Sequence, residues 1–179
     1  HGLKFHDTFG PYAFIIYSIA VSLRDLGMTM APQNAFQTLL GLETLSLRMK
    51  KHVSNSIKIA NWLEKHPKIE KVTYAGLKSS QYFNTAKSFL PKGAGALFTI
   101  SLKDGYEACI KMINKLNLFS HVSNLGDTRS LIIHPASTVH RQLTEEQQKN
   151  AGLAPNVIRL SIGIEDPKDL INDLRNALE

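Results

Sequence analysis

Cysteine is almost absent from this sequence of 179 residues, and its one Cys109 cannot form a disulfide within the chain. Without paired cysteines there is also no thiolate metal site, so we expect a reducing compartment, the cytoplasm. Long hydrophobic runs are absent as well. The longest, 12–23, is interrupted by Tyr17, Ser18 and Ser22 and is shorter than the roughly 18 to 20 residues that cross a bilayer. The sequence therefore predicts no membrane span.

A concentrated patch of positive charge is also lacking, although the formal net charge is +6 and the pI is about 9.4. The Lys and Arg residues are scattered along the chain. Their one local cluster, which consists of Arg48, Lys50 and Lys51 beside His52, has no interleaved aromatic residues that could stack on bases. We therefore expect no nucleic-acid partner, and small anionic ligands suit the charge better.

The apolar residues, 43% of the chain, follow helical spacing in its first third, and this proportion excludes a disordered chain. Positions three and four residues apart through 33–66 form one face of a long helix, which Pro32 opens and Pro67 ends. A shorter helix is expected over 13–26, where Gly27 closes it.

Further along, apolar residues alternate with a period of two, which is typical of strands. Strands are expected at 69–74, 96–102, 119–123, 131–133 and 157–164. Helical spacing returns over 106–116. Capping signals, at Thr144 with Gln147 and at Asp166 with Pro167, predict two more helices. The expected fold is α+β: a small mixed or antiparallel sheet covered on one face by helices, with a long N-terminal helix.

The most concentrated polar stretch runs from His134 to His140. Its two histidines are six residues apart around a proline, a spacing that fits no helical or hairpin zinc site. No nucleophile elbow of the GxSxG kind surrounds Ser137. We expect a loop in which Ser137 and Thr138 satisfy backbone groups, a core position for Cys109, and no metal site in this chain.

Arg159 differs from these residues because it interrupts an apolar strand pattern. The apolar residues that share the opposite face of that strand are Ile158, Leu160, Ile162 and Ile164. An arginine on the other face must pair with an anion or reach solvent, since a buried unpaired charge costs several kcal/mol. Guanidinium suits a carboxylate through two parallel hydrogen bonds. The pattern leaves two alternatives open, a structural salt bridge and an edge strand that faces water.

Several stretches together resemble one family, in that family's order and over nearly all of the chain. They are 22–27 (SLRDLG), 41–49 (GLETLSLRM), 90–95 (LPKGAG), 118–121 (LFSH), 124–127 (NLGD), 133–138 (IHPAST) and 159–166 (RLSIGIED). The chain resembles the C-terminal part of the Cys/Met-metabolism pyridoxal-phosphate enzymes of fold type I. Within that family it is most similar to the O-acetylhomoserine sulfhydrylases.

This resemblance implies a division of the chain and two residues that bind substrate. Residues 1–40 would link to a missing upstream cofactor domain, and 41–179 would form the C-terminal substrate-recognition domain. The arginine of the family's RLSIGIED motif, which grips the substrate α-carboxylate, falls on Arg159. Asn124, within a segment that alone predicts only a turn, is implied as a contact near that carboxylate. Asparagine there is typical of the sulfhydrylases, whereas γ-lyases and γ-synthases usually have serine.

The implied activity is a γ-replacement that depends on pyridoxal phosphate: acetate leaves O-acetylhomoserine and sulfide or methanethiol adds, giving homocysteine or methionine. The family's Schiff-base lysine and other cofactor contacts lie upstream of the segment that matches His1. We therefore expect no catalytic residue and no cofactor in this chain, which alone should be inactive. We also expect a homo-oligomer. A fragment of a cystathionine γ-synthase or methionine γ-lyase, or a truncated non-catalytic remnant, remains the alternative.

Overall fold

A computed structural model of the chain describes residues 2–179, apart from the side chains of Glu145 and Lys149. His1, where the expected linking segment begins, lies outside the described residues. The chain forms two compact units, His1–Thr44 and Leu45–Glu179. The functional division at residue 40 stays a prediction.

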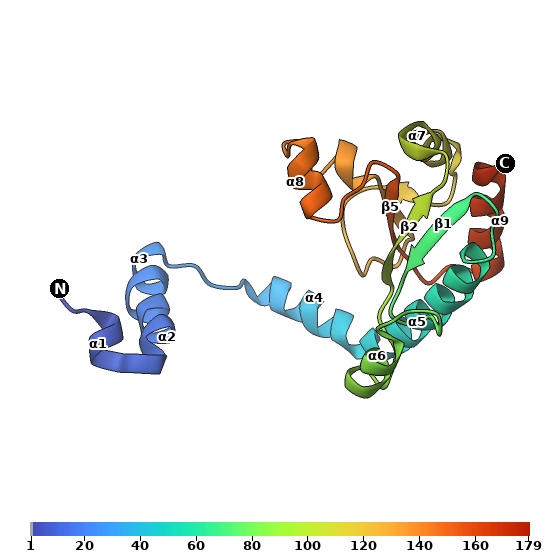
Figure 1. Cartoon of the computed structure of the whole chain (residues 1–179). Helices are drawn as coiled ribbons and strands as arrows, with labels where there is room; N and C mark the ends of the chain where they lie inside the picture. The colour runs from blue at the N-terminus through green and yellow to red at the C-terminus, as the bar shows by residue number, and fades with distance from the viewer. Residues whose placement is uncertain (1) are drawn as a thin grey trace. The chain divides into compact units, whose positions relative to one another are not determined.

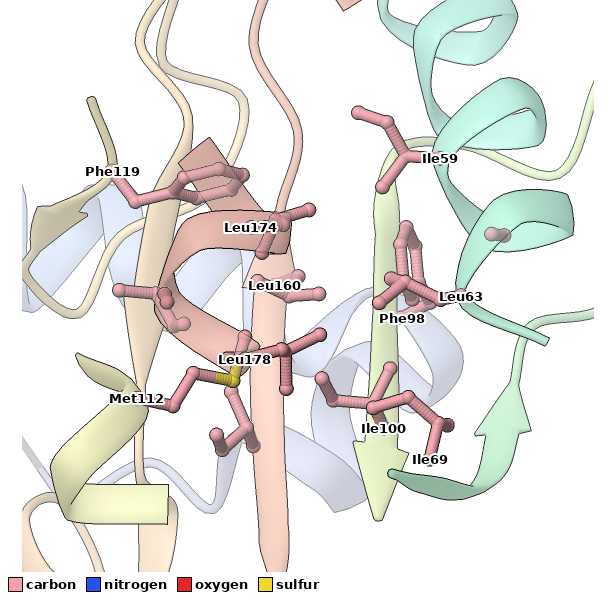
Figure 2. Packing of buried hydrophobic residues seen from close by; sticks show 14 of the residues in the cluster. Ile59, Leu63, Ile69, Phe98, Ile100, Met112, Phe119, Leu160, Leu174 and Leu178 are labelled. Atoms are coloured by element: carbon pink, nitrogen blue, oxygen red, sulfur yellow. The ribbon is translucent and has the colours of Figure 1, made fainter. Parts of the chain in front are cut away.

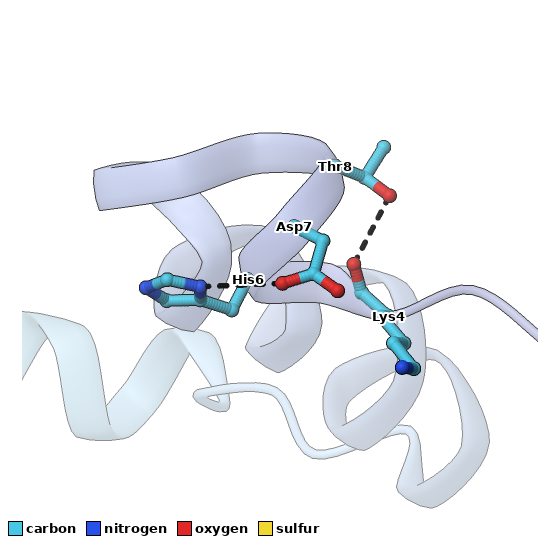
Figure 3. Close-up of polar contacts among 4 residues, drawn as sticks. All are labelled: Lys4, His6, Asp7 and Thr8. Carbon is cyan, nitrogen blue, oxygen red and sulfur yellow. Dashed lines mark hydrogen bonds and ion pairs between the residues drawn. The ribbon is translucent and has the colours of Figure 1, made fainter.

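The first unit consists of short helical segments. They are α1 (Phe5–Phe9), η1 (Gly10–Tyr12), α2 (Ala13–Tyr17), η2 (Ser18–Leu23), α3 (Arg24–Leu26) and α4 (Pro32–Glu43). The helix expected over 13–26 is present, with π-helical winding over Ser18–Leu23, and Gly27 ends it in the left-handed conformation with φ 63°. The sequence pattern did not predict α1. Its local contacts include Thr8 Oγ1 donating to Lys4 O at 3.0 Å (Figure 3).

The long helix expected over 33–66 is present as α4 and α5 (Leu45–Leu63), which Thr44 separates. Thr44 leaves the helical conformation, with φ −100° and ψ 1°. Glycine and β-branched residues lower helix propensity, so the interruption falls where Gly41 and Thr44 make the helix weakest. None of the described helices is long and apolar enough to cross a membrane.

The second unit is built on a five-stranded sheet in the order β1-β2-β5-β4-β3. Its strands are β1 (Ile69–Thr73), β2 (Leu97–Leu102), β3 (Ser120–His121), β4 (Leu131–Ile133) and β5 (Val157–Ser161). Neighbouring strands are antiparallel except for β3 and β4, which are parallel. The expected mixed sheet is confirmed, and β5 occupies its centre. Four strands are shorter than expected, β1 and β2 by one residue each and β3 and β5 by three each. The larger differences arise because the extended pairing stops after His121 and after Ser161.

Helices α5, α7 (Gly105–Lys115) and α9 (Pro167–Leu178) pack on one face of this sheet. Figure 1 shows α5 and α9 on one side of the strands and α8 (Glu145–Asn150) on the other. Figure 2 shows the core between sheet and helices. Its labelled residues are Ile59, Leu63, Ile69, Phe98, Ile100, Met112, Phe119, Leu160, Leu174 and Leu178. The helix-covered face is the one that the alternation in β5 predicts.

Capping interactions begin two helices of this unit as the sequence predicts. Thr144 N donates to Gln147 Oε1 at 2.9 Å and Gln147 N donates to Thr144 Oγ1 at 3.3 Å, which forms the capping box of α8. Asp166 Oδ1 accepts from Lys168 N at 2.7 Å at the start of α9. The sequence pattern missed α6 (Phe83–Phe89) and the single turn η3 (Pro135–Ser137).

Candidate functional site

Arg159 lies in the middle of the central strand, opposite Thr99 of β2 and Ile133 of β4. These three residues share one face of the sheet. On the other face Ile158 and Leu160 are fully buried in the core, whereas Arg159 is half-buried. The strand alternation therefore places Arg159 correctly, away from the apolar set.

The Arg159 guanidinium has one described hydrogen-bond partner: its Nη2 donates to the backbone O of Asn124 at 3.3 Å. Within the part of the chain that the structure describes, no carboxylate lies within 4.0 Å of it. The structural salt bridge that the sequence left open is therefore absent among these residues. A guanidinium has five N–H donors, so one neutral acceptor leaves both charge and donors available to an anion.

Asn124 begins the turn that the sequence predicts. Its Oδ1 accepts from Leu125 N at 2.8 Å, Gly126 has φ 74°, and Asp127 Oδ1 accepts from Arg129 N at 3.0 Å. The structure thus brings together Arg159 and Asn124, the two residues singled out from the sequence. It joins them through the backbone carbonyl of Asn124, while the amide side chain of Asn124 is bonded to its own turn.

A second set of polar contacts joins this turn to the chain beyond β5. The Glu165 carboxylate accepts from Ser130 N at 2.6 Å and from Ser130 Oγ at 2.9 Å, and Ser130 Oγ accepts from Gly163 N at 2.9 Å. Ile164 N donates to Thr128 O at 2.9 Å. The sequence pattern did not reveal Ser130 or Glu165, since no periodicity relates two polar residues 35 positions apart.

Side chains of helix α5 also bond to the backbone of residues 162–165, the segment that follows β5. Asn55 Nδ2 donates to Gly163 O at 3.1 Å and to Glu165 O at 2.8 Å, and His52 Nδ1 bonds to Ile162 O at 2.6 Å. Both side chains are buried, at 1% exposure for His52 and 0% for Asn55. The sequence analysis grouped His52 with the basic residues beside it and did not predict its burial, whereas in the structure its ring is buried and bonds to the chain just after β5.

The stretch from His134 to His140 forms a loop, as expected. Thr138 Oγ1 donates to His134 O at 2.7 Å, and the ring of His134 bonds to Ser137 Oγ at 2.8 Å and to Pro155 O at 2.7 Å. Ser137 is thus paired with His134 and not with His140. Among the described residues no group of three or more His, Cys, Asp or Glu side chains could hold a metal ion.

Cys109 is fully buried on α7, as its apolar helical position predicts. Burial raises the pKa of its thiol to about 11, because desolvation disfavours the thiolate. At neutral pH the group is a protonated core side chain. Cys109 belongs to the core on the helix-covered side of the sheet, whereas Arg159 lies on the other face.

The cofactor implied by the resemblance can be tested against the lysines of the chain. A lysine that forms a Schiff base is activated by desolvation in a pocket. Every lysine side chain that the structure describes is exposed. These residues therefore do not fit the cofactor, and we assign it no contact among them.

Known proteins resemble the chain along almost its whole length. An O-acetyl-L-homoserine sulfhydrylase 1 from Thermus thermophilus is 44% identical, over 99% of this chain and 42% of the relative. An L-methionine gamma-lyase from Fusobacterium nucleatum is 41% identical, over 89% of this chain and 40% of the relative. The chain thus spans about two fifths of the length of these curated relatives.

A solved structure agrees with the sequence matches. It is that of a protein from Campylobacter jejuni described as an O-acetylhomoserine (thiol)-lyase, with N'-pyridoxyl-lysine-5'-monophosphate. Its TM-score is 0.86 at 46% identity, over 96% of this chain and 41% of that one. The mixed sheet and its helices are therefore a domain of fold type I. Residues 12–179 match the profile of the family described as Cys/Met metabolism PLP-dependent enzyme, and the chain belongs to that family.

Proposed function

We propose that this chain is the substrate-recognition part of an O-acetylhomoserine sulfhydrylase. In that reaction O-acetylhomoserine and sulfide give homocysteine and acetate, or methanethiol replaces sulfide and methionine forms. The similarity to relatives with this activity supports the proposal. Because the chain spans about 42% of the first relative, the activity is proposed for the intact enzyme and not for the chain alone.

The observation that carries the proposal is the state of Arg159. It is a half-buried arginine on a central strand, and its only described hydrogen bond is to a neutral carbonyl. We assign it the substrate α-carboxylate, which can accept two parallel charge-assisted hydrogen bonds from one guanidinium. The backbone carbonyl of Asn124 accepts a hydrogen bond from Nη2 of the guanidinium, so Asn124 orients the group that binds substrate.

Pyridoxal phosphate, if bound in the intact enzyme, would supply an electron sink. Arg159 and Asn124 orient the substrate, because binding its α-carboxylate fixes the position of its amino-acid end. An interaction of this kind lowers the entropy cost of reaching the reactive geometry. The chain by itself is expected to be inactive.

A methionine γ-lyase or cystathionine γ-synthase is the second candidate, and the 41% identity to a γ-lyase supports it. These enzymes act on amino acids too, so the Arg159 assignment is the same for both candidates. Asn124 favours the sulfhydrylase, because asparagine before Leu-Gly-Asp is typical of that subgroup. Assaying the intact enzyme with O-acetylhomoserine plus sulfide, and separately with methionine, distinguishes the two.

For the intact enzyme we also propose a homo-oligomer in the cytoplasm. Exposed apolar side chains along 2–44 support association, since large apolar patches tend to be covered by a partner. The single buried cysteine favours a reducing compartment. The upstream cofactor domain is a further proposed partner of this chain.

Substitution of Arg159 in the intact enzyme tests the assignment. Arg159→Lys keeps the charge but loses the fork, so we expect kcat/KM for O-acetylhomoserine to fall about ten- to a hundredfold, the equivalent of one charged hydrogen bond. Arg159→Ala should cost more. Thermal stability should change little, because the side chain lies outside the core. Unchanged kcat/KM with a collapse of stability would identify Arg159 as structural and overturn the proposal.

A further inference from the structure

The turn that holds Asn124 is fixed at one end, by the segment that follows β5. Four hydrogen bonds join 128–130 to 163–165, and three of them include Ser130. We call the pair of Ser130 and Glu165 the Ser130–Glu165 clamp. Ser130 is fully buried, and its hydroxyl both accepts from Gly163 N and donates to Glu165 Oε2. A buried hydroxyl with both roles filled has one orientation, which fixes the backbone on either side.

Gly163 makes this contact tight. A Cβ at this position would collide with the backbone O of Thr128 and lie 2.6 Å from the backbone C of Arg129. The two segments therefore approach as closely as backbone atoms allow, and only glycine permits it. Asn55 binds the carbonyls of Gly163 and Glu165 from α5, so the clamp is fastened to the core helix.

The Ser130–Glu165 clamp connects the segment that α5 holds to the two segments that carry Arg159 and Asn124. Arg159 is part of β5, which leads directly to Gly163, and Asn124 begins the turn that leads to Ser130. The one hydrogen bond of the guanidinium, from Nη2 to Asn124 O, spans these two segments. Anything that separates 128–130 from 163–165 therefore moves the Asn124 carbonyl relative to Arg159.

We infer that Glu165, through Ser130, is a positioning residue that sets the orientation of the Arg159 guanidinium toward a substrate carboxylate. The inference rests on the proposed function of Arg159. Glu165 itself touches backbone and the Ser130 hydroxyl and makes no described contact with Arg159. Its loss should loosen the turn of Asn124 and let the guanidinium rotate out of the productive orientation.

The test compares two ligands that differ only in the carboxylate. L-Norvaline has no leaving group, and butylamine is the same molecule without its carboxylate. In the intact enzyme, calorimetry should show that Glu165→Ala raises the Kd of norvaline about tenfold, since small displacements of a positioned group have effects of this size. The Kd of butylamine should change less than about threefold. An equal rise for both ligands would overturn the inference, because it would indicate general damage.

A conservative substitution separates hydrogen bonding from charge. Glu165→Gln retains an oxygen for Ser130 N and places an amide beside the Ser130 hydroxyl, so most of the norvaline affinity should return. A loss as large as that of Glu165→Ala would overturn the clamp. As a control, Asp173→Ala removes another carboxylate that accepts backbone N–H groups, those of Asn117 and Leu118. It should lower the melting temperature and leave norvaline binding unchanged.

A double substitution tells this inference apart from the proposed function. If Glu165 acts through Arg159, then Glu165→Ala should have no further effect on norvaline binding once Arg159 is alanine. If Arg159→Ala alone leaves norvaline binding unchanged, the proposed function fails. If Arg159→Ala weakens binding and Glu165→Ala does not, only the positioning role fails. A further loss in the double variant would likewise overturn it.

Discussion

In His1–Thr44 and in Leu45–Glu179 the helices carry similar apolar side chains, but only the second unit buries them. No described residue of 2–44 is buried. In the second unit, helices α5, α7 and α9 share one core with the sheet. The difference lies in the sheet, which offers a flat apolar face on which several helices can pack together.

The first unit therefore has helices without a core. Phe14 is 82% exposed. In α4, the side chains of Phe36, Leu39 and Leu40 are each more than half exposed. Helices this short are marginal in water unless a packed face stabilises them. The comparison indicates that the stability of this chain comes from 45–179, whereas 2–44 leaves apolar side chains exposed, and we expect a partner to cover them.

The largest expected effect is a difference in the free energy of unfolding between a substitution in the core of the second unit and one on the surface of the first. Leu160→Ala removes a fully buried side chain from β5, so the free energy of unfolding should fall by about 2 to 5 kcal/mol. Phe36→Ala in the first unit should change it by less than about 0.5 kcal/mol. Urea unfolding at low protein concentration measures both. Equal losses would show that the first unit also has a core.

Deletion of the first unit tests the other half of the comparison. The full chain should self-associate in sedimentation experiments. Residues 45–179 alone should sediment as a monomer, because the exposed apolar side chains of 2–44 have been removed. The urea midpoint of 45–179 should remain close to that of the full chain. A chain that stays monomeric at full length would contradict the assignment of 2–44 as an association surface.

Much of the second unit could be predicted from the sequence, because its strands and helices obey simple periodicities. The alternation in β5 placed Leu160 in the core and Arg159 on the other face, and both positions are confirmed. Asp166 and Thr144 are caps, as their spacing predicts. These features depend on residues within a few positions of each other, so a single sequence contains their whole cause.

The polar contacts that surround the site could not be predicted in this way. Ser130 and Glu165 meet across 35 positions, and Asn55 reaches Gly163 across 108. In the sequence each is an ordinary polar residue, and only the pairing of β4 with β5 and the packing of α5 bring them together. The role proposed for Arg159 rests on a sequence pattern and a resemblance, whereas the contacts of the Ser130–Glu165 clamp are visible only in the structure.

Helix capping offers a smaller test of the same contrast between units. Asp166→Ala removes the side-chain acceptor for Lys168 N at the start of α9, which should cost about 1 kcal/mol. The matched control is Thr38→Ala in α4, whose hydroxyl bonds back to Asn34 O within the helix. Such a bond adds little stability, so the free energy of unfolding should hardly change. A larger loss for Thr38→Ala would break the comparison.

The smallest expected effect is a pH dependence centred on His66, just after α5. Burial lowers the pKa of its imidazole below 6.5, and the positive charges of Lys68 and Arg175 lower it further. The unfolded chain therefore binds the extra proton more readily than the folded chain, so this group costs stability as the pH falls through 6.5. The urea midpoint of the wild type should fall slightly more between about pH 7 and pH 5 than that of His66→Gln, which has no proton to gain. A wild-type midpoint that rises relative to the variant on acidification would mean that the folded state binds the proton better, and the sign of this argument would be wrong.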